Sequence, residues 1–153
     1  MPVFPATAQR VESSGDEAAN RRIQRQIEVN VHYYALHPHE IDTRLAELDE
    51  EWDIERMLEA TAATLALSGT VLGIMRHRAF LALPLAVTGF LLQHALQGWC
   101  PPAAVLRQRG VRTAAEIGSE RAALKALRGD FASVERMPNA PERANAAFQA
   151  AGA

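Results

Sequence analysis

The feature that most constrains this chain is a run of fifty residues, 57–106, that carries only three formal charges. By contrast, residues 1–56 are strongly acidic and residues 107–153 are moderately basic. Two arginines divide the run into apolar segments at residues 57–75 and 79–98. At about 1.5 Å of rise per helical residue, each segment covers roughly 30 Å, the thickness of a bilayer core. The sequence therefore predicts two transmembrane helices joined by a short basic turn.

A pair of buried helices in a soluble all-helical module is the alternative. Helices in soluble proteins keep a polar face that carries charges about once per turn. Here apolar side chains occupy every side of both segments, as at Leu65, Val71, Leu85 and Leu92. The membrane interpretation is favoured. Recovery in the soluble fraction after cell breakage without detergent would support the alternative.

Small residues recur along one side of each apolar segment. Gly69 and Gly73 form a GxxxG pair, a pattern that lets helix backbones approach closely in lipid. Trp99 follows the second segment and suits an interfacial anchor, while Pro84 is tolerated near a helix start. The predicted helix-packing residues are Ala62, Ala66, Gly69, Gly73, Ala86 and Gly89.

The orientation in the membrane follows from the basic residues beside the two segments. Arg76 and Arg78 lie in the turn between them. Seven basic residues lie in the flanks: Arg44, Arg56, Arg107, Arg109, Arg112, Arg121 and Lys125. Because cytoplasmic segments carry the excess of Lys and Arg, we expect both termini in the cytoplasm, and an inner (plasma) membrane protein that crosses the bilayer twice.

The polar arms predict further helices, so that the whole fold is all-α. We expect disorder over residues 1–20, and an amphipathic acidic arm over residues 21–56 that runs directly into the first apolar segment. Within that arm, apolar residues recur at helical spacing: Ile23, Ile27, Val31 and Tyr34, then Ile41, Leu45, Leu48 and Trp52.

After the second apolar segment, Pro101 opens a short interfacial helix within the 57–106 region, and Gly110 ends it. Residues 107–131 hold a C-terminal helix that begins at a capping box, Thr113 to Glu116. Ile117, Leu124 and Leu127 line this helix, which ends near Gly129. We expect a disordered tail over residues 132–153.

Few residues point to chemistry. Cys100 is the single cysteine, and it is interpreted as a small residue that caps a helix at the interface. The alternative is a reactive thiol, because a helix N-terminus predicts a lowered thiol pKa. His94 is interpreted as an interfacial histidine, with a proton relay or a ligand as the alternative. Pro38 interrupts the cluster of His32, His37 and His39, so we expect no metal. The sequence holds no nucleotide loop, nucleophile elbow or basic domain, so we expect no cofactor and no nucleic acid partner.

The hairpin and the stretch Gly98-Trp99-Cys100-Pro101-Pro102, followed by an apolar helix start, resemble the YgaP-like transmembrane-domain family. These are small two-helix inner-membrane proteins of mostly unknown function, and the resemblance extends over residues 37–131. In the best-known relatives the hairpin is attached to a rhodanese domain that carries persulfide sulfur. We expect no such domain here, so the resemblance implies the membrane fold and carries over no sulfurtransferase activity.

Together these features favour a non-enzymatic membrane anchor or interaction module. Its partners would be the lipid bilayer and either a second copy of the chain or another membrane protein. An accessory role in sulfur or redox handling, with Cys100 as the sulfur carrier, is the alternative function.

Overall fold

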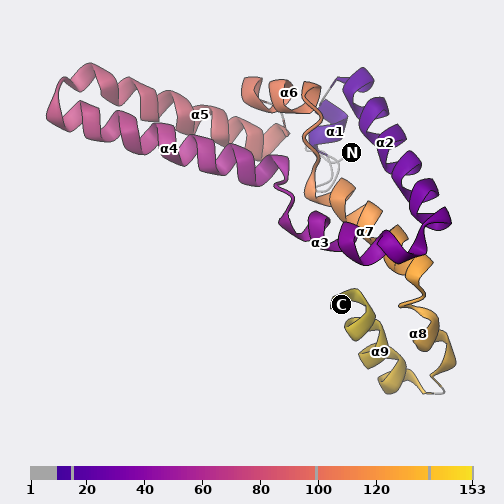
Figure 1. Cartoon of the computed structure of the whole chain (residues 1–153). Coiled ribbons are helices and arrows are strands. Elements are labelled where there is room, and N and C mark those ends of the chain that lie inside the picture. The colour runs from indigo at the N-terminus through magenta and orange to yellow at the C-terminus, as the bar shows by residue number, and fades with distance from the viewer. Residues whose placement is uncertain (1–9, 15, 99, 138, 153) are drawn as a thin grey trace, which may run out of the picture. The chain divides into compact units, whose positions relative to one another are not determined.

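In the computed structural model the described residues, 10–14, 16–98, 100–137 and 139–152, are helical apart from short connections (Figure 1). The chain divides into two compact units. The first unit comprises Met1–Gln24 and Trp52–Ala115, and the second comprises Arg25–Glu51 and Glu116–Ala153. The elements are α1 (Arg10–Ser14), α2 (Glu17–Leu36), η2 (Pro38–Glu40), α3 (Ile41–Glu50), α4 (Ile54–Met75), η3 (Arg78–Leu81), α5 (Ala82–Gln97), α6 (Pro101–Gln108), α7 (Ala114–Arg128), α8 (Ala132–Arg136) and α9 (Ala140–Gly152).

The prediction of disorder over residues 1–20 is wrong where the structure describes this segment. Residues 10–14 form α1, and α2 already begins at Glu17. Val11 and Ala19 are buried, and the Asn20 side-chain amide donates a 2.7 Å hydrogen bond to the Glu12 carbonyl. These contacts order a segment whose composition alone is polar. Residues 1–9 and 15 lie outside the described residues.

The acidic arm does not run directly into the first apolar segment. Helix α3 ends at Glu50, and residues 51–53 are not helical. Asp53 then caps α4, because its carboxylate accepts a 2.7 Å hydrogen bond from the Arg56 amide. Trp52 falls in the break and is 45% exposed, so it does not continue the buried stripe of Ile41, Leu45 and Leu48.

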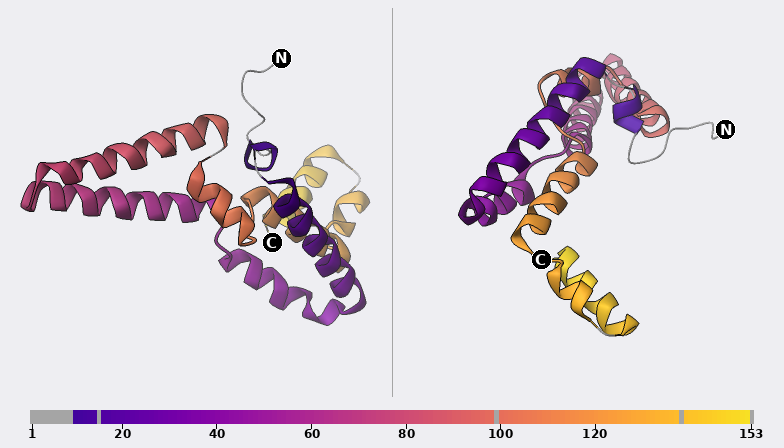
Figure 2. Two further views of the ribbon diagram at one scale, coloured as in Figure 1. Left: turned by 90° about the horizontal axis from the view of Figure 1, so that it is seen from above. Right: turned by 90° about the vertical axis from the view of Figure 1, so that its right-hand side faces the viewer.

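Helices α4 and α5 lie side by side in the first unit and are joined by residues 76–81 (Figure 1). Viewed from above, they diverge as they run away from this connection (Figure 2). Within the connection, the His77 ring nitrogen Nδ1 accepts a hydrogen bond from the Ala79 amide and thereby caps η3. At the other end α5 stops at Gln97, where Gly98 adopts a φ of 74° that favours glycine.

A small core closes the open end of this helix pair. Val11, Ile54, Leu58, Cys100 and Ala103 are buried together. The Ile54 amide donates a 2.9 Å hydrogen bond to the Arg112 carbonyl, which connects the start of α4 to the segment after α6. The buried Arg107 guanidinium donates a 2.6 Å hydrogen bond to the Asn20 side chain. The segments α1, α4 and α6 are therefore held together at one end of α4.

The second unit has an apolar core and also buries charged side chains. Its core consists of Ile41, Leu45, Leu48, Ile117 and Leu124, with Tyr34 packed against it. Of the predicted α7 stripe, Leu127 is instead 44% exposed. Glu120 is fully buried and accepts 3.0 Å hydrogen bonds from Arg44 Nε and from the Asn30 amide. The buried carboxylate is thus paired, as burial of a charge requires.

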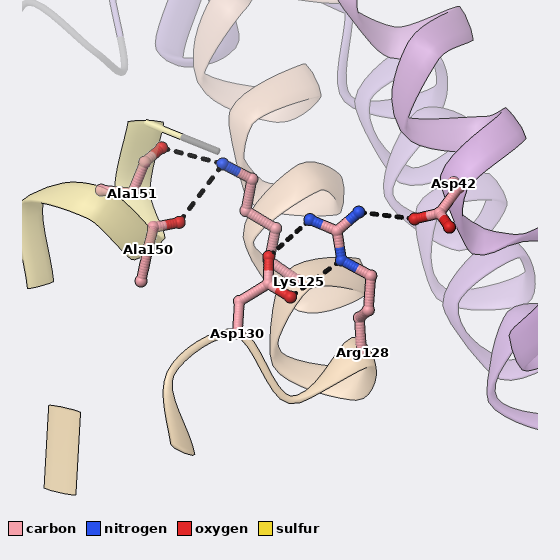
Figure 3. Close-up of polar contacts among 6 residues, drawn as sticks. All are labelled: Asp42, Lys125, Arg128, Asp130, Ala150 and Ala151. Carbon is pink, nitrogen blue, oxygen red and sulfur yellow. Dashed lines mark hydrogen bonds and ion pairs between the residues drawn. The ribbon is translucent and has the colours of Figure 1, made fainter. Parts of the chain in front are cut away.

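The predicted disordered tail is helical in its described residues. Asn139 accepts a 3.0 Å hydrogen bond from the Glu142 amide and so caps α9, whose sequence is rich in alanine. The buried Lys125 ammonium of α7 donates to the carbonyl oxygens of Ala151, at 2.8 Å, and Ala150, at 3.5 Å (Figure 3). A positive charge at a helix C-terminus is favourable, so this contact stabilises the docked tail.

Arg128, at the end of the same helix, connects two carboxylates (Figure 3). Its guanidinium forms two hydrogen bonds to Asp130, of 2.8 and 2.6 Å, and one of 2.5 Å to Asp42 of α3. The hydrogen bonds from Arg128 hold the pKa of Asp130 below its ordinary value. The Arg-Gly-Asp triplet at 128–130 is therefore part of the packing of the second unit.

Candidate functional site: the apolar helix pair

Large apolar side chains of α4 and α5 point away from the protein. The most apolar window of the helical stretch that ends at Met75 is 17% buried, and that of Arg78–Gln97 is 6% buried. A core helix of a soluble protein would be mostly buried. Both stretches are long and apolar enough to cross a membrane. The exposed side chains include Leu65, Leu67, Val71, Leu72, Ile74, Phe80, Leu85, Phe90, Leu92 and Leu96.

Glycines form the closest approach between the two helices. Gly69 and Gly73 are buried in α4. A Cβ added at Gly69 would lie 2.7 Å from Pro84 Cδ, and one added at Gly73 would lie 2.5 Å from Leu81 Cδ2. Both distances are too short for real contacts. At Gly69 a larger side chain would meet the rigid Pro84 ring of α5, whereas at Gly73 it would first meet the movable end of Leu81 in η3.

The small-residue stripe predicted for α5 does not face α4. Ala86 and Gly89 are exposed, and a Cβ added at Gly89 would meet no atom within 4 Å. The less exposed positions of α5 are instead Pro84, Val87, Gln93 and His94. Pro84, Val87 and His94 are three and seven residues apart and so share a helix face. The pattern of small residues is misleading here because Pro84 and bulky side chains, not alanines, provide the contacting face.

An apolar groove opens between α4 and α5 toward the end remote from their connection. Its volume is about 80 Å³ and it is partly open. Ala62, one of the predicted packing residues, lies in this groove, whereas Ala66 is half-buried between the groove and Gly69. The residues that line the groove are Leu58, Thr61, Ala62, Leu65, Val87, Phe90, Leu91, Cys100 and Pro102.

Cys100 is one wall of the groove and is 3% exposed. Burial raises the pKa of its thiol, and a hydrogen bond from the backbone of Ala103 opposes that shift without reversing it. The direction is opposite to the lowering expected from a helix N-terminus. Desolvation by the small core around Val11 and Ile54, which sequence spacing does not reveal, accounts for the difference.

His94 is buried beside a second cavity, of about 160 Å³, which it lines together with Glu55, Glu59, Leu58, Leu91 and Ala95. Glu55 and Glu59 are one turn apart at the start of α4, and His94 is in the last turn of α5. His94, which the sequence interpretation places at the membrane interface, is thus buried near the end of α5 with two acidic neighbours. Among the described residues, no group of three or more His, Cys, Asp or Glu side chains is arranged to hold a metal ion.

The predicted interfacial anchor Trp99 lies outside the described residues. Trp52 has the properties expected of such an anchor, although the sequence pattern assigned it to the buried stripe of the acidic arm. Its exposed ring lies next to the N-terminus of α4, and the Arg56 guanidinium stacks over it, 4.3 Å from the ring centre. Tryptophan is enriched at the boundary between water and bilayer.

Comparison of the chain with protein-family models, with curated proteins and with solved structures finds no match in any of the three.

Proposed function

We propose that this chain is an integral membrane protein in which α4 and α5 cross the bilayer as a helical hairpin. The observation that carries the proposal is the apolar surface of this pair, which is exposed on nearly all its sides. In water such a surface would be costly, at about 25 cal/mol per Å² of apolar area, whereas lipid tails solvate it without penalty. The resemblance to the YgaP-like family points to the same arrangement in the inner membrane.

Two local features support this placement. Close packing at Gly69 and Gly73 is the kind of contact that holds helices together when lipid provides no hydrophobic driving force. Thr64, Ser68 and Thr70 donate hydrogen bonds to carbonyl oxygens four residues earlier, at Ala60, Thr64 and Ala66. Each hydroxyl is thereby satisfied within its own helix, as the apolar interior of a bilayer requires.

We further propose that the hairpin acts as a non-enzymatic anchor and that the helices on both sides form an interaction module at the cytoplasmic surface. The second unit supplies a folded body with its own core, and α2 exposes Val29, Tyr33 and Leu36 at helical spacing. Another copy of the chain or a membrane protein partner is the class of ligand expected for such a surface.

Cysteine labelling of the full-length protein in intact cells tests the hairpin and its orientation. In a Cys100→Ser background, His77→Cys should react with a membrane-impermeant maleimide from outside. Asn145→Cys, on the exposed side of α9, should react only after permeabilisation. The reverse pattern would place the basic turn in the cytoplasm, and labelling of both sites from one side would contradict a two-span hairpin.

A further inference from the structure

The groove between α4 and α5 is a site of defined shape on the surface that the proposed function assigns to lipid. It lies between the N-terminal half of α4 and the middle of α5. Its lining residues carry no formal charge, and Cys100 and Pro102 close one side of it. In a bilayer, the molecules next to such an apolar site are lipids with their acyl chains.

We propose that the groove holds a segment of one acyl chain of a bilayer phospholipid. Leu65, Phe90 and Leu91 line the groove and are also among the exposed apolar residues of the pair. The groove is therefore continuous with the surface that faces lipid under the proposed function, on which this inference rests. A lipid tail reaches it by moving sideways within the bilayer and does not cross a polar barrier.

The size of the groove fits a chain segment better than a second helix. An apolar cavity of about 150 Å³ accommodates benzene. The present volume of about 80 Å³ therefore takes a few methylene groups. A helix of another copy, about 10 Å across with its side chains, would contact only the rim.

Occupancy also explains why the two helices are tight at one end and separate at the other. Near the connection, Gly69 and Gly73 leave no room for even one methyl group. Toward the other end Ala62 opposes Val87 and Phe90 across the groove, and these side chains do not fill it. In a packed protein interior such a gap loses dispersion contacts, and a lipid tail restores them.

Photochemical crosslinking with a lipid probe tests the inference. The full-length protein is reconstituted in phosphatidylcholine vesicles that contain a phosphatidylcholine with a diazirine in one acyl chain. After irradiation, labelled peptides are located by mass spectrometry. Labelling should concentrate on the groove residues Ala62, Leu65 and Leu91, above the level on the lipid-facing residues Leu85 and Leu92. Equal labelling of the two sets would overturn the site.

A matched pair of variants separates the groove from the rest of the membrane surface. Ala62→Phe fills the groove, and Ala63→Phe adds the same ring at the next, exposed position. Groove labelling should fall several-fold in Ala62→Phe alone, while labelling at Leu85 and Leu92 stays unchanged in both. Groove labelling that persists in Ala62→Phe would contradict the acyl-chain site. If Leu85 and Leu92 are labelled and the groove is not, a second copy or nothing occupies it. Absence of label from every position would overturn the membrane proposal itself.

Discussion

The helix pair and the second unit expose and bury opposite kinds of residues. In α4 and α5 the leucines other than Leu58 are on the outside, as is Phe90, and the closest internal contacts are made by glycine. In the second unit Ile41, Leu48 and Leu124 are inside, together with the paired charge of Glu120. The same chain therefore contains one region suited to an apolar solvent and one suited to water. Because both regions are all-helical, the difference lies in which residues occupy the surface and not in the backbone.

The largest effect should come from removing the buried carboxylate of the second unit. Glu120→Ala leaves Arg44, which is mostly buried, without its 3.0 Å partner. Breaking a buried ion pair in this way costs about 3–5 kcal/mol. Urea unfolding of the full-length protein in detergent should show this loss. Glu47→Ala, which removes the exposed partner of the same arginine, should cost less than about 1 kcal/mol. Equal losses in the two variants would show that burial does not distinguish the two pairs.

In the helix pair the corresponding test is to enlarge glycine. Gly69→Leu forces a side chain against the rigid Pro84 ring and should destabilise the pair by about 1–3 kcal/mol. Gly73→Leu should cost less, because its first obstacle is the movable end of Leu81. Thermal unfolding in detergent measures both. Gly89→Leu is the matched control and should be neutral or stabilising, since that position is open. Wild-type stability in Gly69→Leu would contradict the close contact.

An effect of similar size but confined to the tail is expected where Lys125 docks α9. Lys125→Met keeps the length of the side chain but loses the hydrogen bonds to Ala150 and Ala151. The loss of a hydrogen bond to a charged group costs about 1.5–3 kcal/mol. Amide hydrogen exchange in α9 should accelerate while exchange in the centre of α7 does not. Unchanged protection of α9 would show that the tail is held by other contacts.

The smallest effect concerns pH. Because Arg128 lowers the pKa of Asp130, its carboxylate stabilises the folded state above the ordinary pKa of an aspartate. This contribution is lost as the pH falls through the lowered value. The free energies of unfolding of wild type and Asp130→Asn are measured between about pH 7 and pH 2. They should differ most near neutrality, by less than about 1 kcal/mol, and become equal in acid. A difference that persists at the acid end would contradict the ion pair as its source.

Sequence reasoning correctly located the helix boundaries that have local causes. The end of the first apolar helix at Met75 follows from the arginines after it, and α6 and α7 end before glycines, Gly110 and Gly129, whose φ values are 88° and 90°. The contacting face of α5 and the helicity of 10–14 and 140–152 depend on contacts with residues distant in the sequence, such as Lys125 with Ala151. Composition averages over all residues of a segment, so it does not reveal these long-range contacts.

The burial of Cys100 belongs to the same class of long-range effects. Its thiol is desolvated by residues from α1, α4 and α6, so a helix N-terminus does not determine its pKa. The paired burial of Glu120 is likewise invisible to a helical stripe, which marks only apolar positions. A polar residue can be assigned to the core only after its hydrogen-bond or ion-pair partners are known.

The most direct test of the contrast between the two regions is to ask which solvent touches equally exposed leucines. Leu67 of α4, Leu85 of α5 and Leu36 of α2 are 68%, 76% and 80% exposed. Each is replaced by cysteine in a Cys100→Ser background, spin-labelled and reconstituted in vesicles. Collisions with molecular oxygen and with a polar nickel chelate are then measured by electron paramagnetic resonance. The account predicts that oxygen reaches the labels at 67 and 85 while the chelate is excluded, and that the chelate reaches the label at 36. Equal access of the chelate to all three positions would contradict a membrane location for α4 and α5.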